Sequence, residues 1–336
     1  MSRSFITLAA LSIAVATPFI SLQAQAVQRT HVSAAFGSDA NTATNCAAAA
    51  PCRFFAAAMT VTNPNGEVIV LDSGGYGAVT ITQSVALIAP TGVYAGISVF
   101  PGANGVTIAT AGVNVVLRGL TINGQGGNNG ISMTAGNSLT VENCVISNVT
   151  KDGILVNVAT NVNIIDTTVR RNGNNGITLQ NGVTATITRA VVSGNAIFGI
   201  YLYGNTPNTL TVDIADSTVD GNTFGIYGQS SVSNNTVKLS VRDSRIVRNS
   251  SSSVVATSDN GSSVSLTASN NMVSNNVYGL VAAGAGAKVI STGNTVTGNT
   301  SGGFINSGAV FESAGNNTVR DNGPASAGTI TAVGTQ

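Results

Sequence analysis

The sequence predicts an all-β protein, a single right-handed parallel β-helix of about ten or eleven coils with an N-terminal capping helix. Three observations support this prediction. A phrase of the form polar-x-x-(Val/Ile)-x-x-Asn recurs at steps of 23 to 27 residues through the second half of the chain. An apolar residue stands three positions before each Asn, and Gly followed by an apolar residue comes shortly after most of them. A regular period in the twenties is typical of a solenoid.

The asparagine of the repeated phrase marks the coils. It falls at Asn148, Asn172, Asn195, Asn222, Asn249, Asn275, Asn299 and Asn322, and Asn123 extends the series upstream. Stacked asparagine amides bond to one another in a ladder, and Asn tolerates left-handed backbone geometry. We therefore expect a structural ladder that holds the coils in register, in preference to a row that binds sugar.

Two sets of residues accompany this asparagine. The expected internal aliphatic column contains Val145, Val169, Val192, Val219, Ile246, Met272, Val296 and Val319. The glycines expected at tight bends before the next strand are Gly153, Gly176, Gly199, Gly225, Gly279 and Gly303. Equivalent positions of successive coils stack about 4.8 Å apart, so coils from Val68 to Ile330 predict a rod of roughly 50 Å.

Two other architectures share parts of this pattern. Leucine-rich repeats have a similar period but need several Leu at fixed offsets, whereas this phrase is rich in Val, Thr and Asn. A β-sandwich places strands about every 8 to 12 residues without the longer period. The β-helix fits best, and we assign it residues 68–336.

Residues 1–26 have the pattern of a secretory signal peptide. Arg3 precedes an apolar run from Phe5 to Leu22, and Ala24, Gln25 and Ala26 form an A-x-A site. We expect cleavage after Ala26 and a secreted or periplasmic protein; a single membrane anchor is the alternative, against which the interrupting Pro18 argues. No later apolar run is long enough to span a membrane.

The charge balance excludes one class of partner. Loss of the signal peptide removes one of the 14 basic residues and none of the 13 acidic residues, which leaves a net charge near zero. Without a basic field, we expect no nucleic-acid partner.

Residues 27–67 are expected to cap the first coil. The segment from Pro51 predicts a short helix with Phe54, Phe55, Ala58 and Met59 on one apolar face. Cys46 and Cys52 are six residues apart, and in an exported protein they favour a disulfide over a metal site. The third cysteine, Cys144, stands where other coils have Thr168, Val191 and Thr218, and we expect it to be an inert member of that stack.

The stretch from Val32 to Pro90 contains a VSAAFGSD phrase, a loop flanked by cysteines, the capping helix and a GGYG turn. It resembles the opening segment of the pectin-lyase-like right-handed β-helix superfamily, and with the repeats the resemblance covers essentially the whole mature chain. Members of that superfamily include polysaccharide lyases, glycoside hydrolases, uronan epimerases, phage tailspikes and surface proteins. The resemblance implies the fold, and fold alone does not select a reaction.

The sequence holds no complete catalytic motif of these relatives. The pectin hydrolases of this superfamily share an Asp-Asp pair and a Gly-His-Gly phrase. Neither is present in this sequence, and the single His is His31. The WxDH and RxPxxRxG phrases of calcium-dependent pectate lyases are absent as well. Lyase chemistry still requires only a base and a cation that neutralises a carboxylate, so a reduced site must be sought in the stacked coils.

Charged residues collect six positions before the repeated asparagine, in the middle coils. This expected column is Glu142, Asp166, Arg189, Asp216, Asp243, Ser269, Gly293 and Asn316. Arg189 is expected between Asp166 and Asp216, with other charges on the same coils, and the candidate lyase residues are Lys151, Asp166, Arg170, Arg171, Arg189 and Asp216. The other interpretation is a solvent-facing ladder of weak ion pairs. We expect no cofactor, because Glu142 and Asp166 offer only two carboxylates; Ca²⁺ held by that pair is the alternative.

Aromatic residues gather on neighbouring coils. Alternation in the segment IYLY points Ile200 and Leu202 inward and Tyr201 and Tyr203 outward. Nearby rings come from Phe198, Phe224, Tyr227 and Tyr278. A ring face stacks on a pyranose, so Tyr201, Tyr203 and Tyr227 are candidate ligand-binding residues, with simple surface packing as the alternative.

These observations predict an exported β-helix protein that binds extracellular polysaccharide or a cell-surface glycan, or serves as a cell-surface scaffold. The alternative is a polysaccharide lyase or epimerase acting on uronic-acid polymers. If the solenoid has a working face, we expect it near residues 142 to 245. Whether the protein is an enzyme, and its oligomeric state, stay open at this point.

Overall fold

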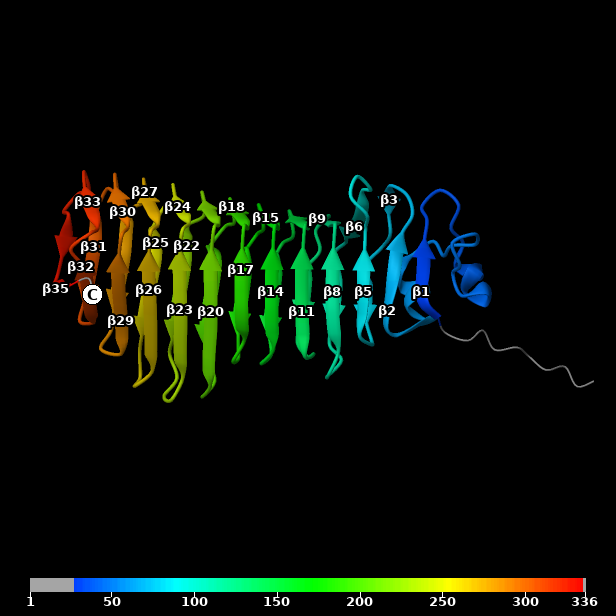
Figure 1. The fold of residues 1–336 in the computed structure, drawn as a ribbon, viewed down its shortest axis with the longest axis horizontal. Coiled ribbons are helices and arrows are strands. Elements are labelled where there is room, and N and C mark those ends of the chain that lie inside the picture. The colour runs from blue at the N-terminus through cyan, green and yellow to red at the C-terminus, as the bar shows by residue number, and fades with distance from the viewer. Residues whose placement is uncertain (1–26, 335–336) are drawn as a thin grey trace, which may run out of the picture.

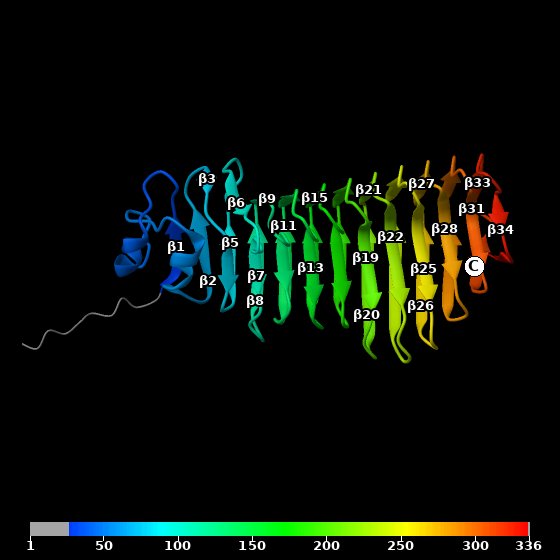
Figure 2. The ribbon, with the colours of Figure 1, turned by 180° about the vertical axis from the view of Figure 1, so that it is seen from behind.

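The computed structural model describes residues 27–334, which form one elongated right-handed parallel β-helix (Figures 1 and 2). The predicted signal peptide and its cleavage site lie outside the described residues. Each coil contributes one strand to each of three sheets, which we call A, B and C in chain order. All the strand pairings in these sheets are parallel, and each strand pairs with the strands one coil earlier and one coil later. The predicted fold class is confirmed.

The strands are short and regular. Sheet A contains β1 (Val27–Val32), β2 (Thr62–Val70), β5 (Val85–Ile88), β8 (Asn114–Arg118), β11 (Ser138–Glu142), β14 (Asn161–Ile165), β17 (Thr184–Thr188), β20 (Thr209–Ala215), β23 (Thr236–Arg242), β26 (Ser263–Ser269), β29 (Ala287–Thr292), β32 (Val310–Ala314) and β35 (Thr331–Val333). Sheet B contains β3 (Gly74–Gly75), β6 (Ala95–Val99), β9 (Leu120–Gly124), β12 (Val145–Ser147), β15 (Thr168–Arg170), β18 (Val191–Ser193), β21 (Thr218–Asp220), β24 (Arg245–Val247), β27 (Met272–Ser274), β30 (Thr295–Thr297) and β33 (Thr318–Arg320). Sheet C contains β4 (Val79–Ile81), β7 (Val106–Ile108), β10 (Ile131–Met133), β13 (Ile154–Asn157), β16 (Ile177–Gln180), β19 (Phe198–Gly204), β22 (Phe224–Ser230), β25 (Ser252–Ser258), β28 (Tyr278–Ala283), β31 (Gly302–Ser307) and β34 (Ser326–Ala327).

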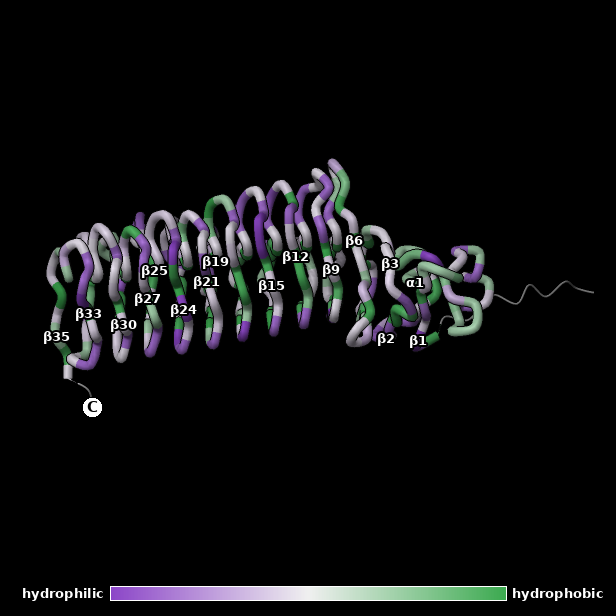
Figure 3. Tube along the Cα trace, turned by 90° about the horizontal axis from the view of Figure 1, so that it is seen from above, coloured by the Kyte–Doolittle hydropathy of each residue, from purple (hydrophilic) through white to green (hydrophobic). Residues whose placement is uncertain are grey.

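The core is a set of aliphatic columns inside the three sheets. Successive side chains of a strand point to opposite faces, so alternate residues of each strand are buried. Apolar segments consequently recur in every coil along the rod (Figure 3). In sheet B the inward column runs through Ile146, Val169, Val192, Val219, Ile246, Val273, Val296 and Val319.

Two members of the predicted aliphatic column were wrong by one position. Val145 pairs with Thr168 and Met272 pairs with Arg245, both on the outer face of sheet B. Met272 is 41% exposed, whereas its neighbour Val273 is fully buried. The error follows from counting back from Asn148 and Asn275, which do not occupy the ladder position.

The asparagine ladder joins seven residues at the corner between sheets B and C. After the first member, each side-chain Oδ1 accepts bonds from the backbone N–H and the Nδ2 of the asparagine one coil earlier, at 2.8 to 3.2 Å. Its members are Asn172, Asn195, Asn222, Asn249, Asn276, Asn299 and Asn322. Asn148 and Asn275 instead lie exposed with positive φ, one residue before the ladder position. Asn123 is also outside it, because it pairs with Ser147. The ladder is therefore structural, with three of the predicted members corrected.

The glycines that follow the ladder are needed for close packing and not for tight bends. None of the six predicted glycines has a positive φ. A Cβ on Gly199 would lie 2.7 Å from the carbonyl oxygen of Gly225 and 2.7 Å from a methyl group of Val219. Similar contacts surround Gly153, Gly176, Gly225, Gly279 and Gly303. Backbone of one coil lies against backbone of the next, and only Gly fits.

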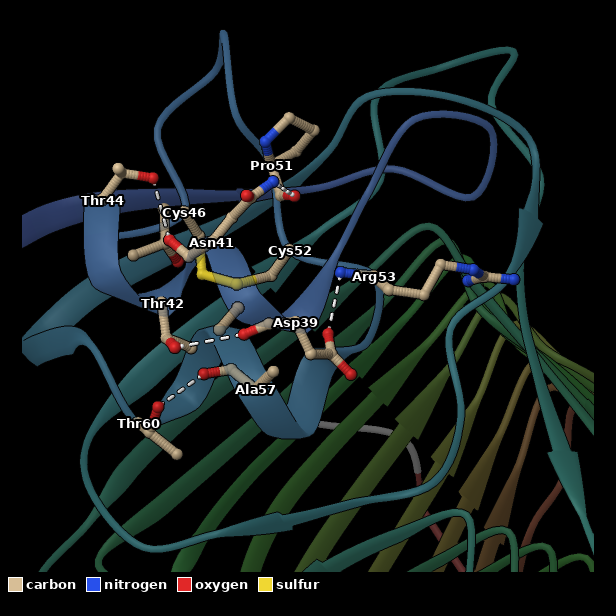
Figure 4. Close-up of a disulfide and its surroundings, with 12 residues drawn as sticks. Asp39, Asn41, Thr42, Thr44, Cys46, Pro51, Cys52, Arg53, Ala57 and Thr60 are labelled. Carbon is tan, nitrogen blue, oxygen red and sulfur yellow. Dashed lines mark hydrogen bonds between the residues drawn. A yellow bond between two sulfur atoms is a disulfide. The ribbon is translucent and has the colours of Figure 1, made fainter.

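The N-terminal end is covered by the 3₁₀-helix η1 (Asp39–Thr44) and the helix α1 (Phe55–Met59), which packs against β1, β2 and β4. Cys46 and Cys52 form the predicted disulfide, and the Asp39 carboxylate beside it accepts a bond from the backbone N–H of Arg53 (Figure 4). Phe54 precedes the helix and stays 40% exposed, unlike the buried face predicted for it.

Sheet A continues into the segment predicted as a cap. Strand β1 pairs with β2, and β2 runs across residue 67, so this segment and the coils share one sheet. The loop after β1 is held by Asp72, whose carboxylate accepts bonds from Ser33 Oγ at 2.6 Å, from the N–H groups of Ala34 and Ala35 at 2.6 and 3.1 Å, and from the Tyr76 hydroxyl. Burial raises the pKa of Asp72, but these bonds outweigh it and lower the pKa to about 2.

Cys144 is the one unpaired cysteine of the described residues, and it is buried. It lies in an inner corner stack, as expected, but its neighbours one and two coils on are Thr167 and Ala190, one residue from the predicted positions. Burial raises the pKa of its thiol to about 12, which agrees with an inert role. Among residues 27–334, no helix has the length and apolar character to cross a membrane.

Candidate functional site

The charged column lies at the corner between sheets A and B, where the backbone turns through a left-handed residue. Its members are Asn143, Asp166, Arg189, Asp216, Asp243 and Asn270, with φ between 49° and 56°. Glu142 and Ser269, which were predicted in it, are each one residue too early and belong to the last positions of β11 and β26. Asn and Asp tolerate left-handed geometry, so the bend itself accounts for most of this composition.

Arg189 is the member of this column that the backbone does not explain. It donates from Nε and Nη2 to the two carboxylate oxygens of Asp166, both at 2.7 Å. These bonds lower the pKa of Asp166 and raise the pKa of Arg189, and the negative charge of Asp216 one coil on also raises the latter. Arg189 thus lies between Asp166 and Asp216 as predicted, but its guanidinium group is hydrogen-bonded to Asp166. A carboxylate held in this way is a weak proton acceptor, which disfavours Asp166 as a catalytic base.

Glu142 has its own partner. The Nε of Arg118 donates to its carboxylate at 2.8 Å. Glu142 and Asp166, the pair of carboxylates considered for Ca²⁺, are therefore each bound to an arginine, Arg118 and Arg189. Within residues 27–334 there is no group of three or more His, Cys, Asp and Glu side chains arranged to hold a metal ion.

The remaining candidate lyase residues lie at the other end of sheet B. Arg170 ends β15, Arg171 follows it with φ 54°, and Lys151 lies in the turn before β13. The three-residue strand that separates them from the charged corner spans roughly 10 Å. The six candidates thus form two groups at two corners and do not converge on one point.

Asp152, next to Lys151, has a role that the sequence did not reveal. It is only 6% exposed and takes an asparagine's place in a second ladder, where Asn129 Oδ1 accepts from its N–H and its own Oδ1 accepts from the N–H of Asn175 at 3.1 Å. Asn174 Nδ2 donates to the same oxygen at 2.6 Å. Burial raises the pKa of Asp152 despite these bonds. The signal in the sequence was its spacing from Asn129 and Asn175.

The predicted tyrosines come together on the outer face of sheet C. Tyr201 pairs in register with Tyr227, while Ile200 and Leu202 are fully buried, which confirms the predicted alternation. The rings form one continuous cluster with centroid distances of 4.4 to 5.5 Å through Phe198, Tyr201, Tyr203, Phe224 and Tyr227. Figure 2 shows the strands β19 and β22 that carry them, seen from behind.

Hydrogen bonds hold two of these rings, Tyr201 and Tyr203. The Tyr201 hydroxyl donates to Gln229 Oε1 at 2.8 Å, one coil away, and Ser231 Oγ donates to the Tyr203 hydroxyl at 3.3 Å. Burial raises the pKa of Tyr201 and of Tyr227, so both stay neutral in ordinary buffers. The cluster is a closely packed, uncharged surface.

Register extends this surface beyond the residues that the sequence indicated. The position of Tyr201 and Tyr227 continues in later coils as Val255, Val281 and Ile305. We call the whole set the sheet C face, which comprises Phe198, Tyr201, Tyr203, Phe224, Tyr227, Val255, Tyr278, Val281 and Ile305. Val255 is only 4% exposed although it points outward, so flanking side chains cover it. The aliphatic members were missed because single Val and Ile residues in a strand resemble ordinary core residues.

The continuous stack of three parallel sheets defines the class of the molecule, a right-handed parallel β-helix protein. The family described as "Right handed beta helix region" matches residues 58–224. The solved structure of pectate lyase Pel9A is 17% identical over 89% of this chain and 80% of its own, with a TM-score of 0.62. The A-module of Azotobacter vinelandii mannuronan C-5 epimerase AlgE4 is 14% identical over 80% of this chain and 88% of its own, with a TM-score of 0.48. No curated protein matches the sequence. The chain thus resembles the pectin-lyase-like right-handed β-helix superfamily and shares its fold.

Proposed function

We propose that this protein is an exported β-helix protein that binds extracellular polysaccharide through the sheet C face without cleaving it. The observation that carries the proposal is the continuous cluster of five rings on β19 and β22, in which Tyr201 and Tyr203 are hydrogen-bonded to Gln229 and Ser231. The flat, apolar face of a sugar ring stacks on such a surface, and rings that are already ordered lose little entropy on binding.

The dimensions of the sheet C face favour a chain ligand over a protein partner. Five neighbouring strands about 4.8 Å apart give a strip roughly 20 Å long, and its five-residue reach along β19 makes it roughly 15 Å wide. That area of about 300 Å² is well below the ~800 Å² per partner of a stable protein interface. An extended sugar chain is narrow enough to fit the strip.

Two further points support the ligand class and the location. The solved pectate lyase that shares the fold acts on pectate, as its name states. The Cys46–Cys52 disulfide agrees with folding in an oxidising compartment, so we propose a secreted or periplasmic location. A role as a cell-surface scaffold is compatible with glycan binding, because the sheet C face lies along the side of the rod and leaves its ends free for attachment.

The geometry favours binding over the lyase or epimerase alternative. Asp166 is closed in a bidentate pair with Arg189, and Lys151 and Arg171 lie at the opposite corner of sheet B. No base and no free cation of this set therefore meet at one carbon of a uronate. Both functions are tested on the same protein, because a lyase releases unsaturated ends that absorb in the ultraviolet.

The test measures retention of the mature protein on immobilised pectate, alginate, cellulose and xylan, with ultraviolet absorbance followed in parallel. We expect retention on at least one polymer, a loss of more than about tenfold in affinity for the Tyr201→Ala, Tyr203→Ala double variant, and no new absorbance. Phe36→Ala is the matched control, since Phe36 is 85% exposed in the loop after β1 and belongs to neither aromatic strand. Tyr203→Ala alone guards against a folding defect in the double variant. Unchanged retention of the Tyr201→Ala, Tyr203→Ala double variant and of Tyr203→Ala, or new absorbance from any uronan, overturns the proposal.

A further inference from the structure

One corner of the rod differs from all the corners that follow it. Six residues, Ala89 to Tyr94, connect β5 to β6, whereas Gly119 alone connects β8 to β9 and two residues connect β11 to β12. The connection from β5 to β6 therefore stands above the corners of the next coils along the rod (Figure 1). It forms one wall of a hollow of about 510 Å³ at the corner between sheets A and B.

The inserted loop is held in place. Val93 N–H donates to the Pro90 carbonyl at 3.1 Å across a turn in which Gly92 has φ +86°. The foot of the loop touches the next coil, where a Cβ on Gly119 would lie 2.5 Å from the Ala89 carbonyl oxygen. Tyr94 N–H donates to Ser73 Oγ at 3.0 Å on the other side. The wall is preformed, as small-molecule sites usually are.

The lining combines apolar surface with a few polar groups. The hollow is lined by Ile88, Ala89, Pro90, Thr91, Gly92, Val93, Arg118, Gly119 and Asn143. Arg118 donates to Glu142 through Nε, and among the described residues its terminal NH₂ groups have no recorded acceptor. Asn143 is exposed at its left-handed position, so its amide is open to a ligand. Thr91 adds a hydroxyl from the loop.

We propose that this hollow binds a neutral sugar of one or two rings, at a site separate from the sheet C face. Glu142 neutralises Arg118, so the site offers donors and acceptors without a net charge, which suits hydroxyl groups better than an anion. The apolar side chains of Ile88, Pro90 and Val93 supply a surface for the face of a ring. The volume lies within the range of about 300 to 1,000 Å³ of small-molecule pockets.

The corner between sheets A and B is the vertex opposite sheet C in the three-sided coil. The two faces therefore cannot contact the same segment of one sugar chain. The inference stands on the loop and the hollow, and does not depend on the proposed role of the sheet C face. If both bind, a single rod links two glycans.

The test uses saturation-transfer NMR and calorimetry on the mature protein with cellobiose, maltose and digalacturonate. We expect one neutral disaccharide to bind with Kd of ~1 mM and to lose at least fivefold in affinity with Asn143→Gly and with Arg118→Gln. The first substitution keeps the backbone, because Gly accepts the φ of 52° at this position. Asn270→Gly is the matched control, since Asn270 occupies the same corner column with φ 56° far from the loop.

The outcomes separate the two sites. Neutral-sugar binding that survives in the Tyr201→Ala, Tyr203→Ala double variant and falls with Asn143→Gly supports the hollow, even if no polymer is retained. Binding of digalacturonate alone, binding unaffected by Asn143→Gly and Arg118→Gln, or no binding tighter than about 10 mM overturns it.

Discussion

Adjacent asparagines in the coil after β27 provide a direct test of the register. Asn276 belongs to the ladder, whereas Asn275 lies exposed one residue earlier with φ 58°. Asn276→Ala removes the Oδ1 that accepts the N–H and the Nδ2 of Asn249 at 2.9 and 3.0 Å. It also removes the Nδ2 that donates to Asn299 Oδ1 at 2.9 Å and to the Ile246 carbonyl at 3.2 Å.

The expected cost of Asn276→Ala follows from the groups that it leaves behind. Each lost bond contributes about 1 kcal/mol net, and each buried polar group left without a partner adds about 1 to 3 kcal/mol. Because small shifts of the neighbouring amides recover part of this, we expect about 3 to 5 kcal/mol of lost stability. Asn275→Gly keeps the backbone conformation and removes only a bond of 3.4 Å to Ser274, so we expect less than about 0.5 kcal/mol.

Urea unfolding followed by circular dichroism measures both variants, and hydrogen exchange locates the effect. The stability of a solenoid is close to a sum of coil and neighbour terms, so Asn276→Ala should speed amide exchange most in the coils around β24 and β27. Equal destabilisation by Asn275→Gly, or a cost of Asn276→Ala below about 1 kcal/mol, would refute the register and the structural role of the ladder.

Three further substitutions test other columns. Gly199→Ala forces a Cβ against the next coil and should lower the free energy of unfolding in urea by about 3 kcal/mol. Gly315 has open space around it, so Gly315→Ala should change stability by less than about 0.5 kcal/mol. Equal effects of the two substitutions would contradict the close packing of Gly199. The raised pKa of Asp152 means that its charged form opposes folding, so the native protein should lose stability as the pH rises above the unfolded pKa of about 3.9. Asp152→Asn should therefore be more stable than the native protein at pH 7 and equally stable in acid. An Asn variant that is less stable at pH 7 would disprove this. The lowered pKa of Asp72, about 2, means that the charged carboxylate stabilises the fold above pH ~4 and that this stabilisation is lost as the pH falls towards 2. Asp72→Asn should therefore reduce the pH dependence of amide hydrogen exchange in the loop after β1. An unchanged pH profile would count against the hydrogen bonds assigned to Asp72.

The repeat period, the fold and the ladder as a feature could be predicted because each coil repeats the same physical requirement. The exact register could not, since two positions of a coil both favour Asn: the left-handed corner and the ladder position after it. Where Asn275 and Asn276 stand side by side, or where Val149 occupies the ladder position after Asn148, composition does not separate them. Backbone hydrogen bonds do, because a one-residue slip turns every inward side chain outward.

The same slip limited the prediction of the site. The pairing of Arg189 with Asp166 could be expected from their shared position, but Glu142 was placed with Asp166 and instead pairs with Arg118. Alternation within one strand predicted the outward Tyr201, whereas the aliphatic part of the sheet C face depends on which residue of each later coil pairs with the one before. The hollow beside Ala89–Tyr94 needed the length of each connection, which is known only once the strands are assigned.

The coils themselves indicate where a function can reside. Inward positions carry the aliphatic columns, the corner after sheet B carries the ladder, and the glycines after it have no space for a side chain. A substitution at any of these positions disturbs the stacking of neighbouring coils, so their residues are set by the fold. Only the outer sheet faces and the lengths of the connections are free to change without that cost. The sheet C face is the outer surface that turns apolar and aromatic, and the β5 to β6 connection is lengthened where the following corners are short. Both proposed sites therefore lie where the chain departs from what the solenoid requires.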